Sequence, residues 1–436
     1  LCTTMPKGAD QEQVNILLQK YQSQAMRTLG FAYKELDENT SAISNGKLQL
    51  NNLDFLGIVG ISDPVRNDVP DAVREVLDAG IDVKIVTGDT PGTAKEIGRQ
   101  VGVWQDDRDN ERNITTGPEI AAMTDDKLEK VASDLKIIAR ARPMDKKRLV
   151  EALQRRNHVV AVTGDGTNDA PALKAAHVGL SMGDGTAVAK EASDITIIDN
   201  SFTSIGRAVM WGRSLYLNIQ RFVLFQLTVN VVACLIVLAG SLMGMESPLT
   251  VTQMLWVNLI MDTFAAVALA SLPPSHQVMK QRPRSRSAFI ITQSMYRFIL
   301  GTGLLFFVLL LALLYRLEHT SINTVTDIFT SPWIKANKGL SPYELSVFFT
   351  VFVFLQFWNM FNAKAYATGR SALHMYGCKG FVLIALIILV GQIAIVQIGG
   401  RFFSVYPLSF IDWGLIIAST SLVLWIGELT RLFSKK

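Results

Sequence analysis

The pattern of apolar and polar residues divides the 436-residue chain into two parts. Up to about Tyr216, short apolar runs alternate with charged, amphipathic stretches, an order typical of the strands and helices of an α/β domain. From Ile219 onward long apolar runs dominate, as in an integral membrane protein. The sequence therefore predicts a soluble α/β part followed by a membrane part.

Short apolar runs in the soluble part predict strands that alternate with helices. The predicted strands are residues 53–61, 81–86, 136–141, 159–162, 178–182 and 195–199. The predicted helices are residues 10–32, 69–79, 92–101 and 186–192, with two more that follow Pro143 and Pro171. This spacing favours a doubly wound parallel sheet. We expect 159–162 to be a buried strand of that sheet, because all four of its residues are apolar.

One turn concentrates carboxylates directly after the predicted strand at 159–162. Thr163-Gly-Asp-Gly-Thr-Asn-Asp169 places Asp165 and Asp169 at the carboxyl end of a strand, where open α/β sheets bind their ligands. Gly164 and Gly166 let the backbone bend and leave room for a phosphate or a hydrated metal ion. Carboxylate oxygens favour Mg2+, which often bridges to substrate phosphates. The alternative is a polar turn with two solvated aspartates, and the length of the run weighs against it.

Two other soluble segments carry groups suited to a phosphoryl ligand. Thr87-Gly-Asp-Thr90 stands directly before a predicted helix, and a hydroxyl with free amides at a helix start suits a phosphoryl group. By themselves these residues are a weak signal. The helix after Pro143 carries Lys146, Lys147 and Arg148, a triplet that usually forms a solvated helix face.

Six apolar runs in the membrane part are each about 20 residues long, enough to cross the hydrocarbon layer as a helix. They cover residues 219–243, 251–272, 295–315, 343–361, 381–398 and 410–426. The loops and tail on the side of the soluble part carry the basic residues Lys280, Arg282, Arg284, Arg286, Arg370, Lys379, Arg431, Lys435 and Lys436. This distribution agrees with a cytosolic soluble domain. The net charge of +4 therefore needs no nucleic-acid partner.

Polar residues inside the second apolar run form another candidate site. Asn258 and Asp262 are four residues apart, which places them on one face of a helix. A carboxylate at this depth costs about 2.5 to 3.5 kcal/mol on insertion scales, so it should meet a cation, a proton or a partner. An interhelical polar contact is the alternative. For Asn258 alone we favour that contact, and for the pair we favour an ion site.

Two stretches resemble P-type cation-transporting ATPases, and most closely their calcium pumps of the plasma-membrane type. The stretches are GDGTNDAPALKAAHVGLSMGDGTAVAKEASD, similar to the hinge motif of that family, and TQMLWVNLIMDTFAAVALA, similar to one of its membrane spans. The resemblance covers nearly the whole chain. It implies the end of a nucleotide-binding domain at 1–50, a haloacid-dehalogenase-like phosphorylation domain at 51–215 and a six-helix transmembrane domain at 216–436.

The resemblance also implies roles for individual residues. In the soluble part, Lys146, Asp165, Asn168 and Asp169 would be catalytic, with Asp165 binding Mg2+. The phosphoryl group and ATP would be held by Thr87, Gly88, Asp89, Lys146 and Asn168. In the membrane part the Ca2+ ligands would be Asn230, Asn258, Asp262 and Gln356. Ala233 stands where two-calcium pumps have a glutamate, and Gln356 replaces an acidic ligand, so we expect one Ca2+ per cycle.

Some parts that the family needs do not occur in this sequence. There is no Asp-Lys-Thr-Gly segment, whose aspartate is the phosphorylated nucleophile of the family. The remaining carboxylate ligand of the calcium site would lie upstream of Leu1. We therefore expect the chain to be the carboxyl-terminal half of an ATP-driven Ca2+ transporter in a lipid bilayer. By itself it would be inactive, and it would need the amino-terminal half of the same protein.

Three other functions remain open at this point. The transported ion could be Mn2+ or another cation, which oxygen ligands also accept. The chain could instead be a membrane-anchored phosphatase of the same fold, although no strand end shows the paired aspartates it would need. It could also be a non-catalytic, ion-binding membrane fragment. The short tail after Ile426 favours a bacterial inner membrane as the location.

Overall fold

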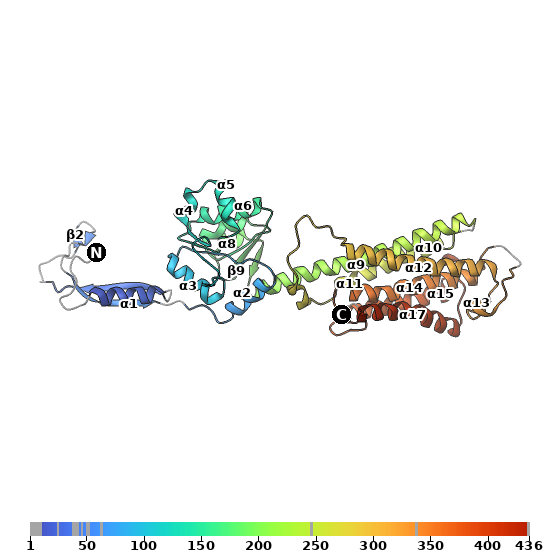
Figure 1. Ribbon diagram of the computed structural model, residues 1–436. Helices are drawn as coiled ribbons and strands as arrows, with labels where there is room; N and C mark the ends of the chain where they lie inside the picture. Colours follow the sequence, from blue (N-terminus) through green and yellow to red (C-terminus); the bar gives the residue numbers. More distant parts are fainter. Residues whose placement is uncertain are drawn as a thin grey trace. The chain divides into compact units, whose positions relative to one another are not determined.

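The structure is a computed structural model, and it describes residues 11–23, 26–36, 43–44, 47–48, 53–61, 64–244, 247–335 and 339–433. The predicted basic residues Lys435 and Lys436 lie outside these ranges. The chain forms two compact units: residues 1–209 with 279–287, and residues 210–278 with 288–436. Figure 1 labels their elements along the chain.

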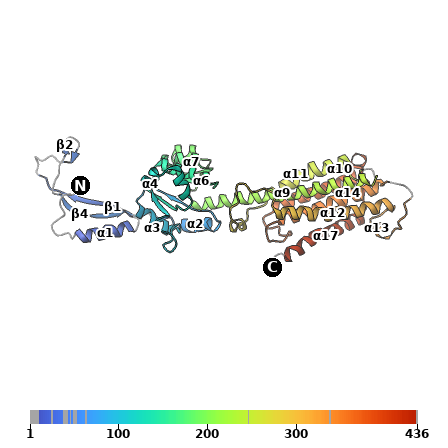
Figure 2. The same ribbon diagram turned by 45° about the horizontal axis from the view of Figure 1, so that its top comes forward.

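The first described elements are one helix and two antiparallel strand pairs. Their bounds are α1 (Gln11–Ser23), β1 (Arg27–Tyr33), β2 (Ile43–Ser44), β3 (Lys47–Leu48) and β4 (Asp54–Ile61). β1 pairs with β4 and β2 with β3, and Figure 2 shows β1 and β4 side by side next to α1. The helix predicted for 10–32 is therefore wrong from Arg27 onward, where β1 begins. Leu29, Phe31 and Tyr33 follow a two-residue period, which suits a strand once β4 supplies a partner.

The rest of the first unit contains two three-stranded parallel sheets, in the orders β5-β7-β6 and β10-β9-β8. The strands are β5 (Ile85–Val86), β6 (Ile114–Thr116), β7 (Ile137–Ala139), β8 (Ala161–Gly164), β9 (Val178–Met182) and β10 (Ile195–Ile197). The helices are α2 (Val69–Asp78), α3 (Pro91–Val101), α4 (Gly117–Ala122), α5 (Asp125–Ala132), α6 (Pro143–Arg155), α7 (Ala170–Ala175) and α8 (Ala187–Ala192). The predicted α/β class with parallel strands is confirmed, and its strands are divided between two sheets.

Each of these sheets has one edge strand that precedes a predicted site turn. β8 is an edge, and Val159 just before it is 65% exposed, so the prediction of a buried strand at 159–162 is wrong. The physical reason is that β8 has a strand partner on one side only among the described residues. β5 is an edge of the other sheet. Val86 and Val160 pack against one apolar cluster that includes Leu149, so both edges border the same core.

Helix α6 is fixed by its apolar face. Pro143 stands in its first turn, where a missing amide hydrogen is tolerated, and Leu149, Val150 and Leu153 are buried. This packing determines the direction in which the polar residues of the first turns, including Lys146, project.

Within the described residues, six helices of the second unit are long and apolar enough to cross a membrane, as predicted. They are α9 (Phe202–Leu242), a segment formed by α10 (Val251–Leu255), η2 (Trp256–Met261) and α11 (Asp262–Ala270), then α12 (Gln293–His319), α14 (Pro342–Ala365), α15 (Lys379–Ile398) and α17 (Phe410–Phe433). Short helices are η3 (His276–Lys280), α13 (Asp327–Thr330) and α16 (Gly400–Phe403). The apolar part of α14 is 83% buried, against 28–44% for the others, so α14 is the central helix of the bundle.

Candidate functional site

The turn after β8 holds its two aspartates in different environments. Asp169 ends a 3₁₀ turn, where Oδ1 accepts a hydrogen bond from Lys146 Nζ at 2.6 Å and Oδ2 accepts one from the Gly166 amide at 3.2 Å. The side chains of Lys146 and Asp169 are only 19% and 14% exposed. Asp165 is exposed, and its carboxylate has no hydrogen bond or ion pair within the described ranges. Asp169 therefore organises the turn, whereas Asp165 keeps its oxygens free.

Backbone contacts fix the shape of this turn. A Cβ atom at Gly164 would lie 2.5 Å from Asp169 Cβ, so only glycine allows Asp169 to fold back against the strand end. The Asp165 carbonyl accepts a hydrogen bond from the Thr186 amide at 2.8 Å, directly before α8. Asn168 is exposed on the same turn. The turn is therefore tied to α6 and α8 and presents Asp165 and Asn168 outward.

The second predicted phosphoryl segment forms a closed turn after β5. Thr87 Oγ1 donates to Asp89 Oδ2 at 2.8 Å and accepts from the Asp89 amide at 3.1 Å. Gly88 between them is exposed, and the Asp89 carbonyl accepts from the Arg140 amide at 2.9 Å. The first turn of α3 begins two residues later, and its amides lack partners within the helix. The two halves of the predicted phosphoryl site therefore follow β5 and β8, the edge strands that border one core.

The free carboxylate of Asp165 fits a Mg2+ ligand. Mg2+ usually takes one or two protein carboxylates and completes its shell with water and substrate phosphates. An exposed, unpaired aspartate beside two glycines allows both kinds of additional ligand. Asp169 fits this role less well, because Lys146 and the Gly166 amide already use its oxygens.

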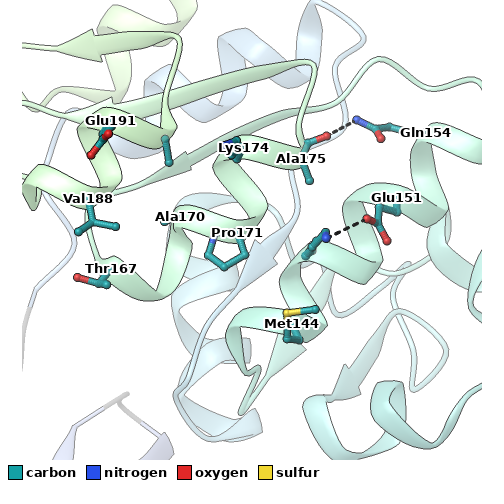
Figure 3. A pocket seen from close by; sticks show the side chains of 12 residues that line it. Met144, Glu151, Gln154, Thr167, Ala170, Pro171, Lys174, Ala175, Val188 and Glu191 are labelled. Atoms are coloured by element: carbon teal, nitrogen blue, oxygen red, sulfur yellow. Dashed lines mark hydrogen bonds and ion pairs between the residues drawn. The ribbon is translucent and has the colours of Figure 1, made fainter.

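A hollow of about 870 Å³ lies next to the turn, between α6, α7 and α8 (Figure 3). Thr167 of the turn lines it, together with Met144, Glu151 and Lys174. Lys147 on its rim forms an ion pair of 3.5 Å with Glu151. The predicted residues Lys146 and Asp165 are not among its lining residues. The hollow is therefore beside the predicted phosphoryl site and is not part of it.

In the second unit, two predicted cation ligands are buried without partners. Asp262 is 3% exposed and Gln356 is 0% exposed. Both carboxylate oxygens of Asp262 and both terminal atoms of Gln356 are buried and make no hydrogen bond to any residue that the structure describes. Leaving such groups unsatisfied is costly in an apolar core. A cation that binds these oxygens would remove that cost.

Asn258 and Asp262 do not share a buried face, which corrects the prediction from their spacing. Asn258 is exposed and Asp262 is buried. A π-helical turn, Trp256–Met261, lies at this point of the span, and in it the Asp262 amide bonds to the Val257 carbonyl five residues back. π-helical turns of this kind occur often at functional sites.

The first span contributes less to this core than predicted. Asn230 on α9 is half-buried. Ala233, which stands where a second carboxylate was considered, is 1% exposed and brings no ligand atom. Within the described part of the second unit, the buried polar groups that lack partners therefore include one predicted carboxylate, that of Asp262.

Sequence reasoning missed Asn359. It is 0% exposed on α14, and both of its terminal atoms are buried and unpaired. It lies three residues after Gln356, so the two amides are neighbours on one helix face. That spacing inside an apolar run was the available signal, and it is also typical of interhelical contacts.

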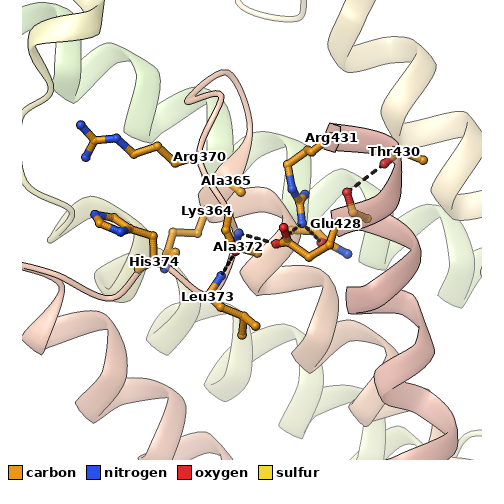
Figure 4. Close-up of polar contacts among 12 residues, drawn as sticks. Lys364, Ala365, Arg370, Ala372, Leu373, His374, Glu428, Thr430 and Arg431 are labelled. Carbon is orange, nitrogen blue, oxygen red and sulfur yellow. Dashed lines mark hydrogen bonds and ion pairs between the residues drawn. The ribbon is translucent and has the colours of Figure 1, made fainter. Parts of the chain in front are cut away.

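Other polar groups of this unit find partners within the chain (Figure 4). Glu428 Oε1 accepts from the Ala372 amide at 2.6 Å and from Arg431 Nη2 at 2.9 Å. Lys364 Nζ donates to the His374 carbonyl at 2.8 Å. These buried charges at the helix ends therefore have partners. Single atoms of other side chains, such as Arg431 Nε, are also unpaired, but among the described residues Asp262, Gln356 and Asn359 have both terminal polar atoms unpaired.

Comparisons with known proteins give matches to both units of the chain. The family described as "Cation transporting ATPase, C-terminus" matches residues 246–433, and "haloacid dehalogenase-like hydrolase" matches residues 8–177. The chain is 38% identical over 428 residues to "Putative calcium-transporting ATPase 13, plasma membrane-type" of Arabidopsis thaliana, covering 98% of this chain and 40% of that protein. It is 37% identical to "Calcium-transporting ATPase PAT1" of Dictyostelium discoideum over 98% of this chain and 39% of that protein. It is 38% identical to "Plasma membrane calcium-transporting ATPase 4" of Homo sapiens over 92% of this chain and 33% of that protein.

A haloacid-dehalogenase-like unit joined to six membrane-spanning helices defines a multi-pass membrane protein of the ATPase type, and the chain belongs to the P-type cation-transporting ATPases. Its relatives within that family are calcium-transporting ATPases of the plasma membrane, and it corresponds to their carboxyl-terminal portion. The chain spans about a third to two fifths of the length of these relatives.

Proposed function

We propose that this chain is the carboxyl-terminal part of an ATP-driven Ca2+ pump that forms an aspartyl-phosphate intermediate and moves one Ca2+ per cycle. The observation that carries the proposal is Asp262, a buried carboxylate with two unpaired oxygens behind a π-helical turn. Gln356, and Asn230 and Asn258 nearer the surface, would supply neutral oxygens. One carboxylate with neutral ligands suits a single hard divalent cation.

In the soluble unit, we assign the predicted residues to phosphoryl transfer. Asp165 would hold Mg2+, which on binding neutralises charge on the transferred phosphoryl group. Lys146, held by Asp169, places its ammonium beside the turn, where it offsets the same charge. Thr87, Gly88 and Asp89 would bind the phosphoryl group and ATP, with Asn168 beside them.

The open edges of β5 and β8 support a contribution from the amino-terminal part of the same protein. Each is an edge strand, each is followed by a predicted phosphoryl turn, and both border one apolar core. A parallel strand inserted between them would join the two sheets and bring an aspartate to the level of both turns. Because the chain contains no Asp-Lys-Thr-Gly segment, we expect no phosphorylation of this chain alone. The domain boundaries near residues 50 and 215 belong to the same proposal.

The test compares the complete protein, including the phosphorylated segment, with its Asp262→Asn variant. We expect Ca2+-dependent phosphorylation by ATP in the parent and none in the variant, because the variant loses the buried carboxylate that this chain contributes to the site. Phosphorylation by inorganic phosphate without Ca2+ serves as the control for folding and should persist. A variant that keeps normal Ca2+ dependence would contradict the proposed transport site and would favour the membrane-anchored phosphatase.

The same assay distinguishes Ca2+ from Mn2+. Oxygen ligands accept both ions, and the unpaired amide and carboxylate oxygens do not discriminate strongly between them. We propose Ca2+, since the relatives named above are calcium-transporting. Half-saturation by Mn2+ at a lower concentration than by Ca2+ would reverse this assignment. The soluble unit would face the cytosol of a plasma membrane, and the bacterial origin is a prediction that the flanking gene sequence would test.

A further inference from the structure

The face of α14 that carries Asn359 points into the bundle core. Three other residues of the helix, Phe354, Trp358 and Asn362, contact α17. The rings of Phe354 and Trp413 are 6.0 Å apart, Trp358 Nε1 donates to Thr420 Oγ1 at 3.2 Å, and Asn362 Nδ2 donates to the Val423 carbonyl at 3.1 Å. At about 100° per residue, Gln356 lies on the side of the helix away from this contact and Asn359 lies about a quarter turn from its middle. Neither amide makes a hydrogen bond to a described residue of α17.

The neighbours on that face belong to the same core as the predicted cation ligands. Phe352 and Ala363 flank the amides of Gln356 and Asn359 along the helix, and both are 0% exposed. They belong to one apolar cluster with Val229 of α9 and with Met261, which directly precedes Asp262. Asn359 therefore lies in the same buried core of the bundle as Gln356 and Asp262, and it is sealed from solvent.

The hydrogen-bonding state of Asn359 excludes an interhelical contact as its role in this structure. A residue that glues helices together has a partner, as Asn362 does one turn later. Among the residues that the structure describes, three side chains have both terminal polar atoms buried and unpaired: Asp262, Gln356 and Asn359. Two of these are the proposed ligands. A buried amide without a partner costs free energy unless a ligand satisfies it.

We infer that Asn359 is a further ligand of the transported cation. Its side-chain amide oxygen would join the amide oxygen of Gln356 and the carboxylate of Asp262. This rests on the proposed function of the membrane core. An amide oxygen is a hard, neutral donor that Ca2+ accepts readily, and it adds a ligand without adding charge. The site would then receive two neutral oxygens from one face of α14 and its charge from Asp262.

The test measures the Ca2+ concentration that half-saturates phosphorylation by ATP in the complete protein. Asn359→Leu should raise this concentration on the order of tenfold, because a ligand oxygen is lost. Phosphorylation by inorganic phosphate without Ca2+ should not change. The matched control is Asn362→Leu on the same helix, which removes a bond to α17 and should lower thermal stability while leaving half-saturation unchanged. Equal half-saturation in Asn359→Leu and the parent, or an equal rise in the Asn362→Leu control, would overturn the inference.

A second variant covers the case in which Asn359→Leu does not fold. Asn359→Asp keeps the oxygen and adds charge, so half-saturation should occur at a several-fold lower Ca2+ concentration. An unchanged or higher concentration would contradict a ligand role. The Asp262→Asn variant separates this inference from the proposed function: if Asp262→Asn removes Ca2+ dependence and Asn359 variants do not affect it, the inference alone fails. If Asp262→Asn also leaves Ca2+ dependence intact, the proposed function fails with it.

Discussion

The aspartates of the two units differ in how their surroundings satisfy them. In the soluble unit, Asp169 is largely buried and meets both an ammonium group and a backbone amide. In the membrane unit, Asp262 is more deeply buried and meets neither. A buried charge without a partner is costly, so the second arrangement lowers stability until a cation or a proton joins it. The presence or absence of a partner within the chain therefore distinguishes aspartates that organise a site from aspartates that bind a ligand.

The largest expected effect comes from removing the partner of a buried carboxylate. It shows whether the presence of a partner, and not the degree of burial, decides whether a buried carboxylate is stable in the fold. Glu344 is buried in the membrane unit like Asp262, yet it accepts from Lys335 Nζ at 2.7 Å and from the Ser341 amide at 2.7 Å, and the two side chains of the pair are 2% and 8% exposed. Lys335→Met should lower the free energy of unfolding in detergent by about 3 to 5 kcal/mol, since it leaves an uncompensated buried carboxylate. Chemical denaturation of the purified chain measures this value.

The control for that change is the double variant Lys335→Met with Glu344→Gln. It removes the stranded charge and should recover most of the lost stability. If Lys335→Met alone had no effect, an unpaired buried carboxylate would be tolerated without a ligand, and the comparison between Asp262 and Asp169 would lose its basis.

The next effect has the opposite sign and concerns Asp262 itself. Asp262→Leu should raise the free energy of unfolding of this chain without Ca2+ by about 2.5 to 3.5 kcal/mol, because the insertion cost of the carboxylate disappears. Thermal unfolding in detergent with a chelator measures it. Such a gain in stability is expected when a residue kept for function destabilises the fold. If the Asp262→Leu variant unfolded at a lower temperature than the parent, Asp262 would have a structural partner.

The sequence was sufficient to predict what depends on local pattern. Strand 178–182 and the six spans follow from apolar runs, and the structure confirms them. The strand β1 was missed because its partner β4 is about 27 residues away along the chain, and pairing overrides a helical pattern. The segment with β6, α4 and α5 received no prediction.

The membrane site was predicted only in part, for two physical reasons. Asn258 is exposed although Asp262 is buried, and a four-residue spacing cannot reveal which of the two residues is covered by neighbouring helices. Asn359 was missed because a buried amide in a span reads equally well as an interhelical contact. Only the structure shows that its terminal atoms have no partner.

A smaller effect is expected in the soluble turn. Lys146→Met removes the ammonium that binds Asp169 Oδ1 and should lower the free energy of unfolding by about 1.5 to 3 kcal/mol, the usual value for a hydrogen bond to a charged group. Chemical denaturation followed by a probe in the soluble unit measures it. The control is Lys147→Met on the same helix, whose ion pair with Glu151 is more exposed and longer, and which should change stability by less than about 1 kcal/mol. Equal losses in both variants would show that Asp169 does not depend on Lys146.

The smallest effect concerns a soluble carboxylate that the chain satisfies with neutral donors. The Thr115 hydroxyl and the Thr116 amide donate to Glu119 Oε2 at 2.7 and 2.8 Å and hold the pKa of Glu119 below its usual value. Because the folded state has the lower pKa, the stabilisation is present above the unfolded pKa and is lost as the pH falls through the folded one.

Glu119→Gln should therefore lower the unfolding temperature at about pH 6 and change it little at a second, more acidic value below the folded pKa, where Glu119 is protonated in the parent as well. Scanning calorimetry of parent and variant at both values measures the difference. Glu111→Gln is the control for the loss of one carboxylate, since Glu111 is an exposed residue of the same unit. The difference in unfolding temperature between Glu119→Gln and the parent could instead be the same at both pH values. Hydrogen bonds from neutral donors would then not favour the ionised form of Glu119. Carboxylates of this unit would in that case need an ammonium partner, as Asp169 has in Lys146, to be stabilised in their charged form.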